Sequence, residues 1–190
     1  NAALKKGHDQ SPWDAGLVAE AERIHEARLY AHGLAAPVFS ALAERFGYSD
    51  MTLEYHPGYC LEKGFRQALN EVVMIDRASG RTSLGPHTCS WRISREGVDV
   101  GDCFSQGQQK MVYFALVCAK HEVMRGQGVN PIFLMDDFAA ELDEQHKSIV
   151  AGWFSGMGGQ GFVTAIHKEA VAGLGMGALF HVEQGCVVGG

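Results

Sequence analysis

The sequence predicts an α/β fold whose first half is a mixed, largely helical lobe. Two apolar runs in the last third, Ile132–Met135 and Phe162–Ile166, have the composition of buried strands, and the helical segment Leu142–Trp153 separates them. Strand, helix and strand in this order are typical of a parallel sheet. The first half instead carries apolar residues at spacings of three and four, as amphipathic helices do.

The first half opens with the pattern of a helix start. Residues 11–14 (Ser-Pro-Trp-Asp) offer an N-cap serine, a proline at the first helical position and an acid in the first turn. An apolar stripe over 17–31 and a second stripe ending at Phe46 follow, and Gly33 and Pro37 interrupt the helix without necessarily ending it. We expect a helical arm with a solvated polar face.

The rest of the chain divides into short elements by the same criteria. The pattern predicts strands at Met51–Tyr55, Arg81–Pro86 and Ser90–Ile93, helices at Leu61–Asp76 and Gly107–Met124, and a terminal hairpin of Leu179–Val182 and Cys186–Val188. We divide the chain into an arm lobe, 1–125, which ends in the helix Gly107–Met124, and a C-terminal α/β part, 126–190.

Composition excludes several classes of protein. The net charge of −6 excludes a uniformly basic nucleic-acid-binding surface, so any DNA contact needs a local patch. The five cysteines form no C-x-x-C pattern and fit reduced thiols in the cytoplasm rather than a zinc site or a disulfide framework. No apolar run reaches the roughly 20 residues that span a bilayer, so no membrane partner is expected. The chain opens without Met or a signal peptide, which predicts a fragment or a processed piece.

Residues 105–110 (Ser-Gln-Gly-Gln-Gln-Lys) stand at the start of a predicted helix. Gly107 permits close backbone approach, Ser105 offers a hydroxyl, and backbone N–H groups at a helix N-terminus bind anions. Alone, such a segment is explained as a capped helix start. It lies, however, 26 residues before an acidic pair that ends an apolar strand. In that setting it resembles the signature motif of ATP-binding-cassette (ABC) ATPases.

Asp136 and Asp137 form this acidic pair, and they resemble the Walker B motif of the same ATPases. A strand that ends in two acids presents the first carboxylate at the carboxyl edge of the sheet, where α/β proteins bind ligands. Asp136 is expected to hold Mg²⁺, directly or through water, and Asp137 to orient or deprotonate the attacking water. The alternative is that both acids serve the start of the next helix.

Two further positions follow from the ABC resemblance. Ala140-Glu141-Leu142-Asp143 stands where the D-loop crosses the dimer interface, so Glu141 and Asp143 are expected at that interface; first-turn helix chemistry is the alternative. His167 follows the second apolar strand, where an ABC head carries its switch residue, and it is expected to sense γ-phosphate as a hydrogen-bond donor. A purely structural histidine is the alternative.

The Gly-rich phosphate loop G-x-x-x-x-G-K-[ST] occurs nowhere in the 190 residues. The sequence therefore predicts the C-terminal half of an ABC-type ATPase head without its phosphate-loop half, joined to a helical arm lobe. We expect an ATPase only as part of a longer chain that carries this loop. The 190 residues alone are expected neither to bind ATP well nor to form a stable monomer.

Several strings then match one family in order along nearly the whole chain. They are Asn1–Lys5, Pro12–Asp14, Gly85–His87, Ser105–Lys110, Asp136–Asp143, Phe162–Ala165 and Phe180–Gly185. The chain is similar to the C-terminal portion of RecF, the bacterial recombination mediator ATPases related to structural-maintenance and Rad50-type heads. It departs from the family at residues 88–90 (Thr-Cys-Ser), where a basic residue and an Asp are usual, so an ionic contact there is not expected.

The resemblance implies ATP- and Mg²⁺-dependent binding to gapped, single-stranded and double-stranded DNA in the cytoplasm. It implies a homodimer that closes on two ATP molecules, slow hydrolysis that dissociates it, and cooperation with RecO and RecR in loading RecA. By position, Ser105, Gly107 and Gln108 contact the γ-phosphate of the partner's ATP, and Gln106 belongs to the same nucleotide-binding segment.

Two other hypotheses stay open at the level of sequence. The chain is also compatible with another ABC- or SMC-type head, although a Rad50-like head needs a long heptad coiled coil before the signature segment. A non-catalytic dimerisation or DNA-binding module that retains the motifs as relics is the second. It predicts that Asp137→Asn changes nothing.

Overall fold

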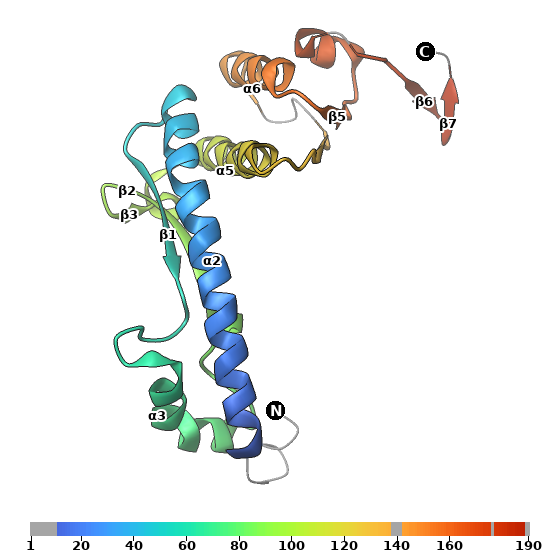
Figure 1. The fold of residues 1–190 in the computed structure, drawn as a ribbon. Coiled ribbons are helices and arrows are strands. Elements are labelled where there is room, and N and C mark those ends of the chain that lie inside the picture. Colours follow the sequence, from blue (N-terminus) through green and yellow to red (C-terminus); the bar gives the residue numbers. More distant parts are fainter. Residues whose placement is uncertain (1–10, 138–141, 176, 189–190) are drawn as a thin grey trace. The chain divides into compact units, whose positions relative to one another are not determined.

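The computed structural model describes residues 11–137, 142–175 and 177–188 (Figure 1). The chain forms two compact units, 1–105 and 106–190, which divide between Ser105 and Gln106. The predicted boundary at residue 125 is a division by function and stays a prediction. Each unit is described by itself below.

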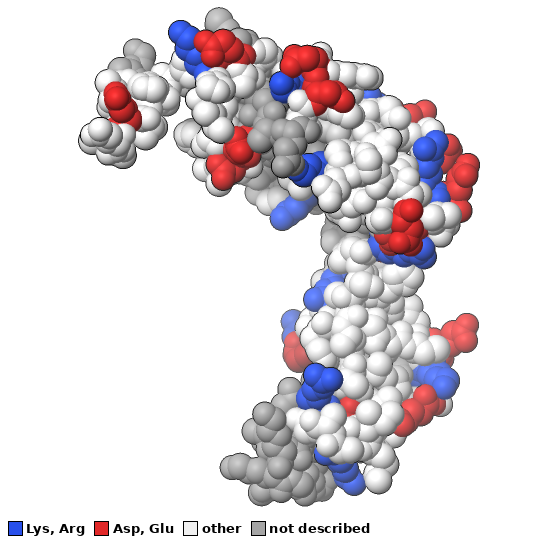
Figure 2. Space-filling model, turned by 180° about the vertical axis from the view of Figure 1, so that it is seen from behind, with Lys and Arg blue, Asp and Glu red and all other residues white. Residues whose placement is uncertain are grey.

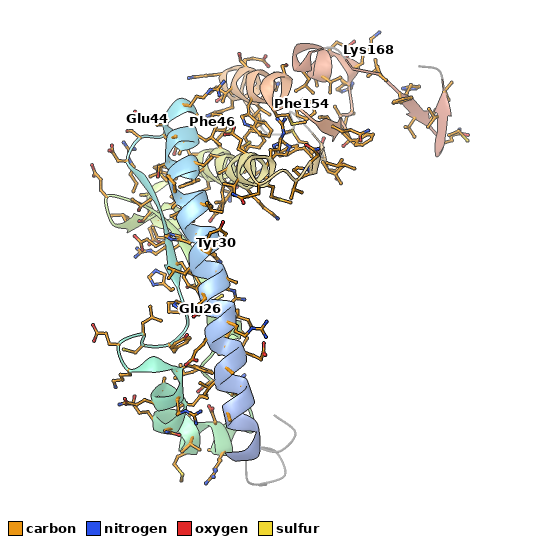
Figure 3. The ribbon with its side chains drawn as sticks, viewed as in Figure 1. Glu26, Tyr30, Glu44, Phe46, Phe154 and Lys168 are labelled. Carbon is orange, nitrogen blue, oxygen red and sulfur yellow. The ribbon has the colours of Figure 1, made fainter. Side chains whose placement is uncertain are left out.

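The first unit is built on one long helix, α2 (Ser11–Arg45). Pro37 lies inside it, so the helix continues although a proline removes the hydrogen bond that the Gly33 carbonyl would accept. Phe39, Leu42 and Ala43 are buried, whereas Glu26 and Tyr30, four residues apart, are exposed on the same helix (Figure 3). The predicted arm with a solvated polar face is therefore one continuous helix over most of its length.

A small antiparallel sheet packs beside α2 in the first unit. It consists of β1 (Met51–His56), β2 (Ser90–Arg95) and β3 (Val98–Asp99), with Met51 paired with Arg95 and His56 with Ser90. Met51, Leu53 and Ile93 are buried, as the period-2 alternation of strands requires. The helix α3 (Gly64–Ser79) lies between β1 and β2 in sequence, and the short helix α4 (Val100–Cys103) follows β3.

The strand predicted at Arg81–Pro86 is wrong. These residues form bends and lead into a 3-10 helix, η1 (Pro86–Thr88). The backbone N–H of Ser83 donates to the Asp76 carboxylate (2.9 Å), and Gly85 has φ 144°, a conformation that favours glycine. Arg28 of α2 donates to the Pro86 carbonyl at 2.6 Å. Side chains therefore satisfy this backbone, and a strand ladder does not form.

The second unit alternates helices and strands in the predicted order. It contains α5 (Gln106–Gly126), β4 (Ile132–Met135), α6 (Glu144–Gly156), β5 (Gln160–Val163), the 3-10 helix η2 (Lys168–Leu174), β6 (His181–Glu183) and β7 (Cys186–Val188). β4 and β5 are parallel, with Ile132 opposite Gln160 and Met135 opposite Val163. β6 and β7 form the predicted hairpin around Gln184 and Gly185, both at positive φ.

β4 is a parallel strand as predicted, but it is not buried on both faces. Phe133 is 6% exposed, whereas Ile132 and Leu134 are 58% and 73% exposed. In the described structure the unbroken apolar run is therefore covered on one face only. Within the described residues β4 also pairs along one edge only, with β5. β5 also begins and ends earlier than predicted, because its pairing with the four residues of β4 begins at Gln160.

Over the described ranges, no helix combines the length and the apolar character needed to cross a bilayer.

Candidate functional site

The acidic pair lies directly after β4, at the carboxyl end of the parallel strands. Asp136 and Asp137 are both exposed. Thr164 directly follows β5, and its hydroxyl donates to Asp136 Oδ1 at 2.6 Å. The same hydroxyl oxygen accepts from the backbone N–H of Asp137 at 2.8 Å. One threonine on the neighbouring strand therefore contacts both predicted catalytic residues.

Asp137 has φ 52°, in the left-handed region that non-glycine residues rarely adopt. Asp is among the side chains that tolerate this conformation best. The backbone turns sharply there, so the two carboxylates do not continue the alternation of the strand. Asp137 is thus a strained position at a strand end, a type of position that clusters at functional sites.

The geometry at Asp136 is compatible with a Mg²⁺ ion. One carboxylate oxygen accepts from Thr164, and within the described residues Oδ2 has no hydrogen-bond partner. In the described part of the chain, no three His, Cys, Asp or Glu side chains gather as a metal site. Mg²⁺ in nucleotide sites takes one or two carboxylates and completes its shell with phosphate oxygens and water, so a single Asp136 is sufficient from this chain.

The signature segment begins at Ser105, which is exposed and directly precedes α5. The helix starts at Gln106, one residue before the predicted start at Gly107. A Cβ placed on Gly107 would meet no atom of the described chain within 4 Å, so the approach to this backbone is open. The N-terminus of a helix is the positive end of its dipole and favours anions.

The D-loop segment is described only in part. Glu141 lies outside the described residues. Asp143 is the N-cap of α6, where its carboxylate accepts from the His146 backbone N–H at 2.8 Å and contacts His146 Nδ1 at 3.0 Å. The hydrogen bond from the His146 N–H, followed by the charge of His146, lowers the pKa of Asp143. Asp143 thus has the helix-capping role that the sequence left as an alternative; its predicted place in a dimer interface stays a prediction.

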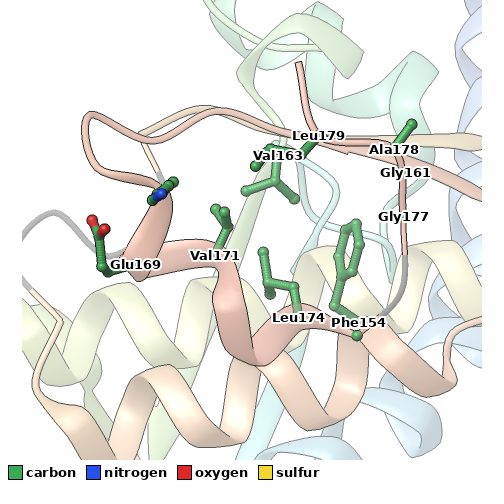
Figure 4. A pocket seen from close by; sticks show the side chains of 11 residues that line it. Phe154, Gly161, Val163, Glu169, Val171, Leu174, Gly177, Ala178 and Leu179 are labelled. Carbon is green, nitrogen blue, oxygen red and sulfur yellow. The ribbon is translucent and has the colours of Figure 1, made fainter. Parts of the chain in front are cut away.

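His167 is exposed and precedes η2, where its carbonyl accepts from the Ala170 N–H at 3.1 Å. Next to it, a cavity of about 470 Å³ lies between α6, β5, η2 and residues 177–179 (Figure 4). Its walls are mostly apolar and include Phe154 and Leu174, while Lys168 and Glu169 are the charged residues that line it. Neither Asp136 nor Asp137 is among the residues that line this cavity.

An aromatic cluster packs around Phe133 of β4, the strand that directly precedes the acidic pair. Phe133 contacts the rings of Phe114, His121, Trp153 and Phe154, with the nearest centroid, that of Trp153, at 5.0 Å. The Trp153 N–H donates to Glu122 at 3.0 Å. This core ties β4 to α5 and α6, and it places the carboxyl end of the strand.

His121 is the unusual member of this cluster. It is 4% exposed, and neither ring nitrogen has a hydrogen-bond partner within the described structure. Burial, followed by the nearby charge of Arg125, lowers the pKa of His121 below the ordinary histidine value, although Glu122 opposes this effect. The residue is therefore a buried histidine whose neutral form is favoured.

We expect the unfolding free energy to fall as the pH drops from 7 to 5, and His121→Leu to reduce this fall. Unfolded His121 takes up its proton near pH 6.5, whereas the folded residue resists protonation to lower pH. The contribution of His121 to the unfolding free energy is therefore fully present above the pKa of the unfolded residue. It declines below that pH, by up to about 1.4 kcal/mol per pH unit. Urea unfolding at both pH values measures this difference. Equal pH dependence in the variant would contradict the assignment.

Thr164 is the site residue that the sequence reasoning missed. A threonine that follows the apolar run of β5 was a detectable signal, because the ends of adjacent parallel strands meet at one sheet edge. The geometry brings Asp136, Asp137 and Thr164 together. It does not test the predicted roles of the signature segment and His167.

Comparisons with known proteins identify relatives of this chain. RecF of Saccharophagus degradans is 35% identical over 188 residues, and the match covers 93% of this chain and 51% of that protein. RecF of Cellvibrio japonicus is 34% identical over 185 residues, with the same coverage of 93% and 51%. No protein-family model matches the chain. The chain thus spans about half the length of the relatives it matches.

The solved structure of the recombination mediator protein RecF with ATP resembles the fold, with a TM-score of 0.75 at 20% identity. The match covers 98% of this chain and 54% of the RecF chain in that structure. This likeness confirms the predicted α/β fold class, because the chain shares the fold of the part of that structure which it covers. The chain therefore matches the C-terminal portion of RecF, a DNA replication and repair protein.

Proposed function

We propose that this chain supplies the Walker B acids and the signature segment of a RecF-type ATPase that acts in DNA replication and repair. The observation that carries the proposal is the exposed pair Asp136 and Asp137 at the carboxyl end of β4, in a sequence 35% identical to RecF over 188 residues. Asp136 holds Mg²⁺, and Asp137 orients or deprotonates the attacking water.

In the proposed cycle, bound ATP holds two heads together until it is hydrolysed. Two heads close around two ATP molecules, and the Ser105–Gln108 segment of one head contacts the γ-phosphate of the ATP bound to the other. Exposed Ser105, the open approach to Gly107 and the N-terminus of α5 support this contact. Slow hydrolysis then separates the heads. His167 senses the γ-phosphate, and Glu141 and Asp143 line the interface between the heads.

In the proposed pathway the dimer binds gapped, single-stranded and double-stranded DNA, and it works with RecO and RecR to load the recombinase. A solved relative, the recombination mediator protein RecF, belongs to the RecFOR pathway by its description. Figure 2 shows acidic and basic side chains interspersed on the face in view, which agrees with the net charge of −6. DNA binding therefore depends on a local patch and on the rest of the protein.

Ser105→Arg is expected to block ATP-dependent dimerisation of the complete protein while each head still binds ATP. The long cationic side chain fills the surface that faces the partner's phosphate, but it does not touch the nucleotide bound to its own head. Analytical ultracentrifugation with and without a non-hydrolysable ATP analogue measures the dimer, and nucleotide titration measures binding.

Ser148→Arg is the matched control, because it adds the same side chain at an exposed position of α6. This control should dimerise as the natural protein does. A Ser105→Arg protein that still dimerises with ATP would contradict the contact in trans.

A further inference from the structure

One hydroxyl at the candidate site makes two hydrogen bonds with different partners. Thr164 Oγ1 donates its proton to the Asp136 carboxylate at 2.6 Å and accepts the Asp137 N–H at 2.8 Å. The backbone of Thr164 is itself held, because its N–H donates to the Met135 carbonyl at 3.0 Å and extends the β4–β5 ladder. The hydroxyl is therefore fixed at the sheet edge by the strand that carries it.

A role in core packing does not explain these bonds. Thr164 is exposed, and so are Asp136 and Asp137. An exposed polar triad of this kind adds little to the stability of a fold. Its effect is local: it sets the direction of one carboxylate and the backbone conformation of the next residue.

Asp137, whose N–H donates to Thr164, has a backbone conformation that is unusual for its place in the fold. Four described non-glycine residues have positive φ: Asp50, Glu96, Asp137 and Gln184. Glu96 and Gln184 lie in hairpin turns next to a glycine that also has positive φ, and Asp50 lies in the turn before β1. Asp137 instead is the second residue after the end of the parallel strand β4. The hydrogen bond from the Asp137 N–H to Thr164 Oγ1 links this strained residue to the end of β5.

We infer that Thr164 is a positioning residue of the ATPase: its hydroxyl holds the Asp136 carboxylate and the Asp137 backbone in the geometry that the hydrolytic step requires. Residues that hydrogen-bond to a metal ligand orient that ligand and tune its affinity for the metal. Thr164 donates to Asp136 Oδ1, so Oδ2 is the oxygen that would hold the metal. This inference rests on the proposed function.

The first measurement tests the hydrogen bonds without any nucleotide. In the complete protein with nitrogen-labelled aspartate, NMR follows the amide exchange of Asp137, whose signal is assigned by its loss in Asp137→Asn. Thr164→Val has nearly the same shape as threonine but lacks the hydroxyl, so the Asp137 amide is expected to exchange at the rate of an unprotected amide. Thr164→Ser restores the hydroxyl and is expected to restore slow exchange.

The second measurement tests the consequence for catalysis. Thr164→Val is expected to lower kcat for ATP hydrolysis by about 10- to 100-fold, the usual effect of losing a partner of a metal ligand. The KM for ATP should stay within about twofold, because Thr164 contacts no nucleotide group in the proposed site. Thr164→Ser is expected to keep kcat close to that of the natural protein, which a loss of local packing would not predict.

The two measurements separate the possible failures. Unchanged Asp137 exchange in Thr164→Val, or an unchanged kcat, would overturn the positioning role while the proposed ATPase stands. A complete natural protein without ATP turnover would overturn the proposed function and this inference with it. Fast exchange together with a reduced kcat, both restored by serine, is the result that supports it.

Discussion

Asp137→Asn is expected to reduce ATP hydrolysis by the complete protein about 10²- to 10⁴-fold, the range for loss of a general base. Asparagine has the size of aspartate and tolerates the left-handed backbone at φ 52°, so the site keeps its shape. ATP still closes the dimer, and ATP-dependent DNA binding should persist or last longer. Phosphate release at steady state and the dissociation rate from gapped DNA measure the two effects.

Asp50→Asn is the matched control for this substitution. Asp50 is exposed and also has positive φ, at 60°, but it lies in the first unit before β1. Its substitution should leave hydrolysis unchanged. If the turnover of Asp137→Asn equals that of this control, Asp137 does not activate the attacking water.

Phe133→Ala is expected to lower the unfolding free energy of the second unit by about 3–5 kcal/mol, the usual cost of removing a buried phenylalanine. The ring is 6% exposed and touches four other aromatic rings, so the surrounding side chains cannot close the space it leaves. Chemical denaturation followed by tryptophan fluorescence measures this loss, and Trp153 of the same cluster contributes to the signal.

Leu134→Ala provides a control on the next residue of the same strand. Leu134 is 73% exposed, so its loss should change the unfolding free energy by about 0.5 kcal/mol or less. Comparable losses for the two variants would contradict the one-sided burial of β4. In that case other parts of the complete protein cover Leu134.

The order of elements in this chain could be predicted from local pattern alone. The helix α2, the parallel pair β4 and β5 and the closing hairpin all carry strong periodicity or turn signals. The strand predicted at 81–86 is wrong because its backbone bonds to two side chains, those of Asp76, seven residues before Ser83, and of Arg28, 58 residues before Pro86. A partner as distant in sequence as Arg28 leaves no local pattern.

The site was predicted unevenly for the same reason. Asp136 and Asp137 could be found because an acidic pair after an apolar strand is a local signal. Thr164 was missed, because it stands 28 residues after Asp136, and only the parallel pairing of β4 and β5 brings the two residues together. The burial of β4 was overestimated because an unbroken apolar run does not specify what covers each face.

Sequencing the coding DNA for several hundred bases upstream of the Asn1 codon is the most direct test that this chain completes an ATP site. The predicted result is an in-frame G-x-x-x-x-G-K-[ST] loop between a strand and a helix, the phosphate-binding half that the Walker B acids and the signature segment serve. A start or stop codon reached in frame with no such loop would contradict the ATPase and leave an interaction module as the better explanation.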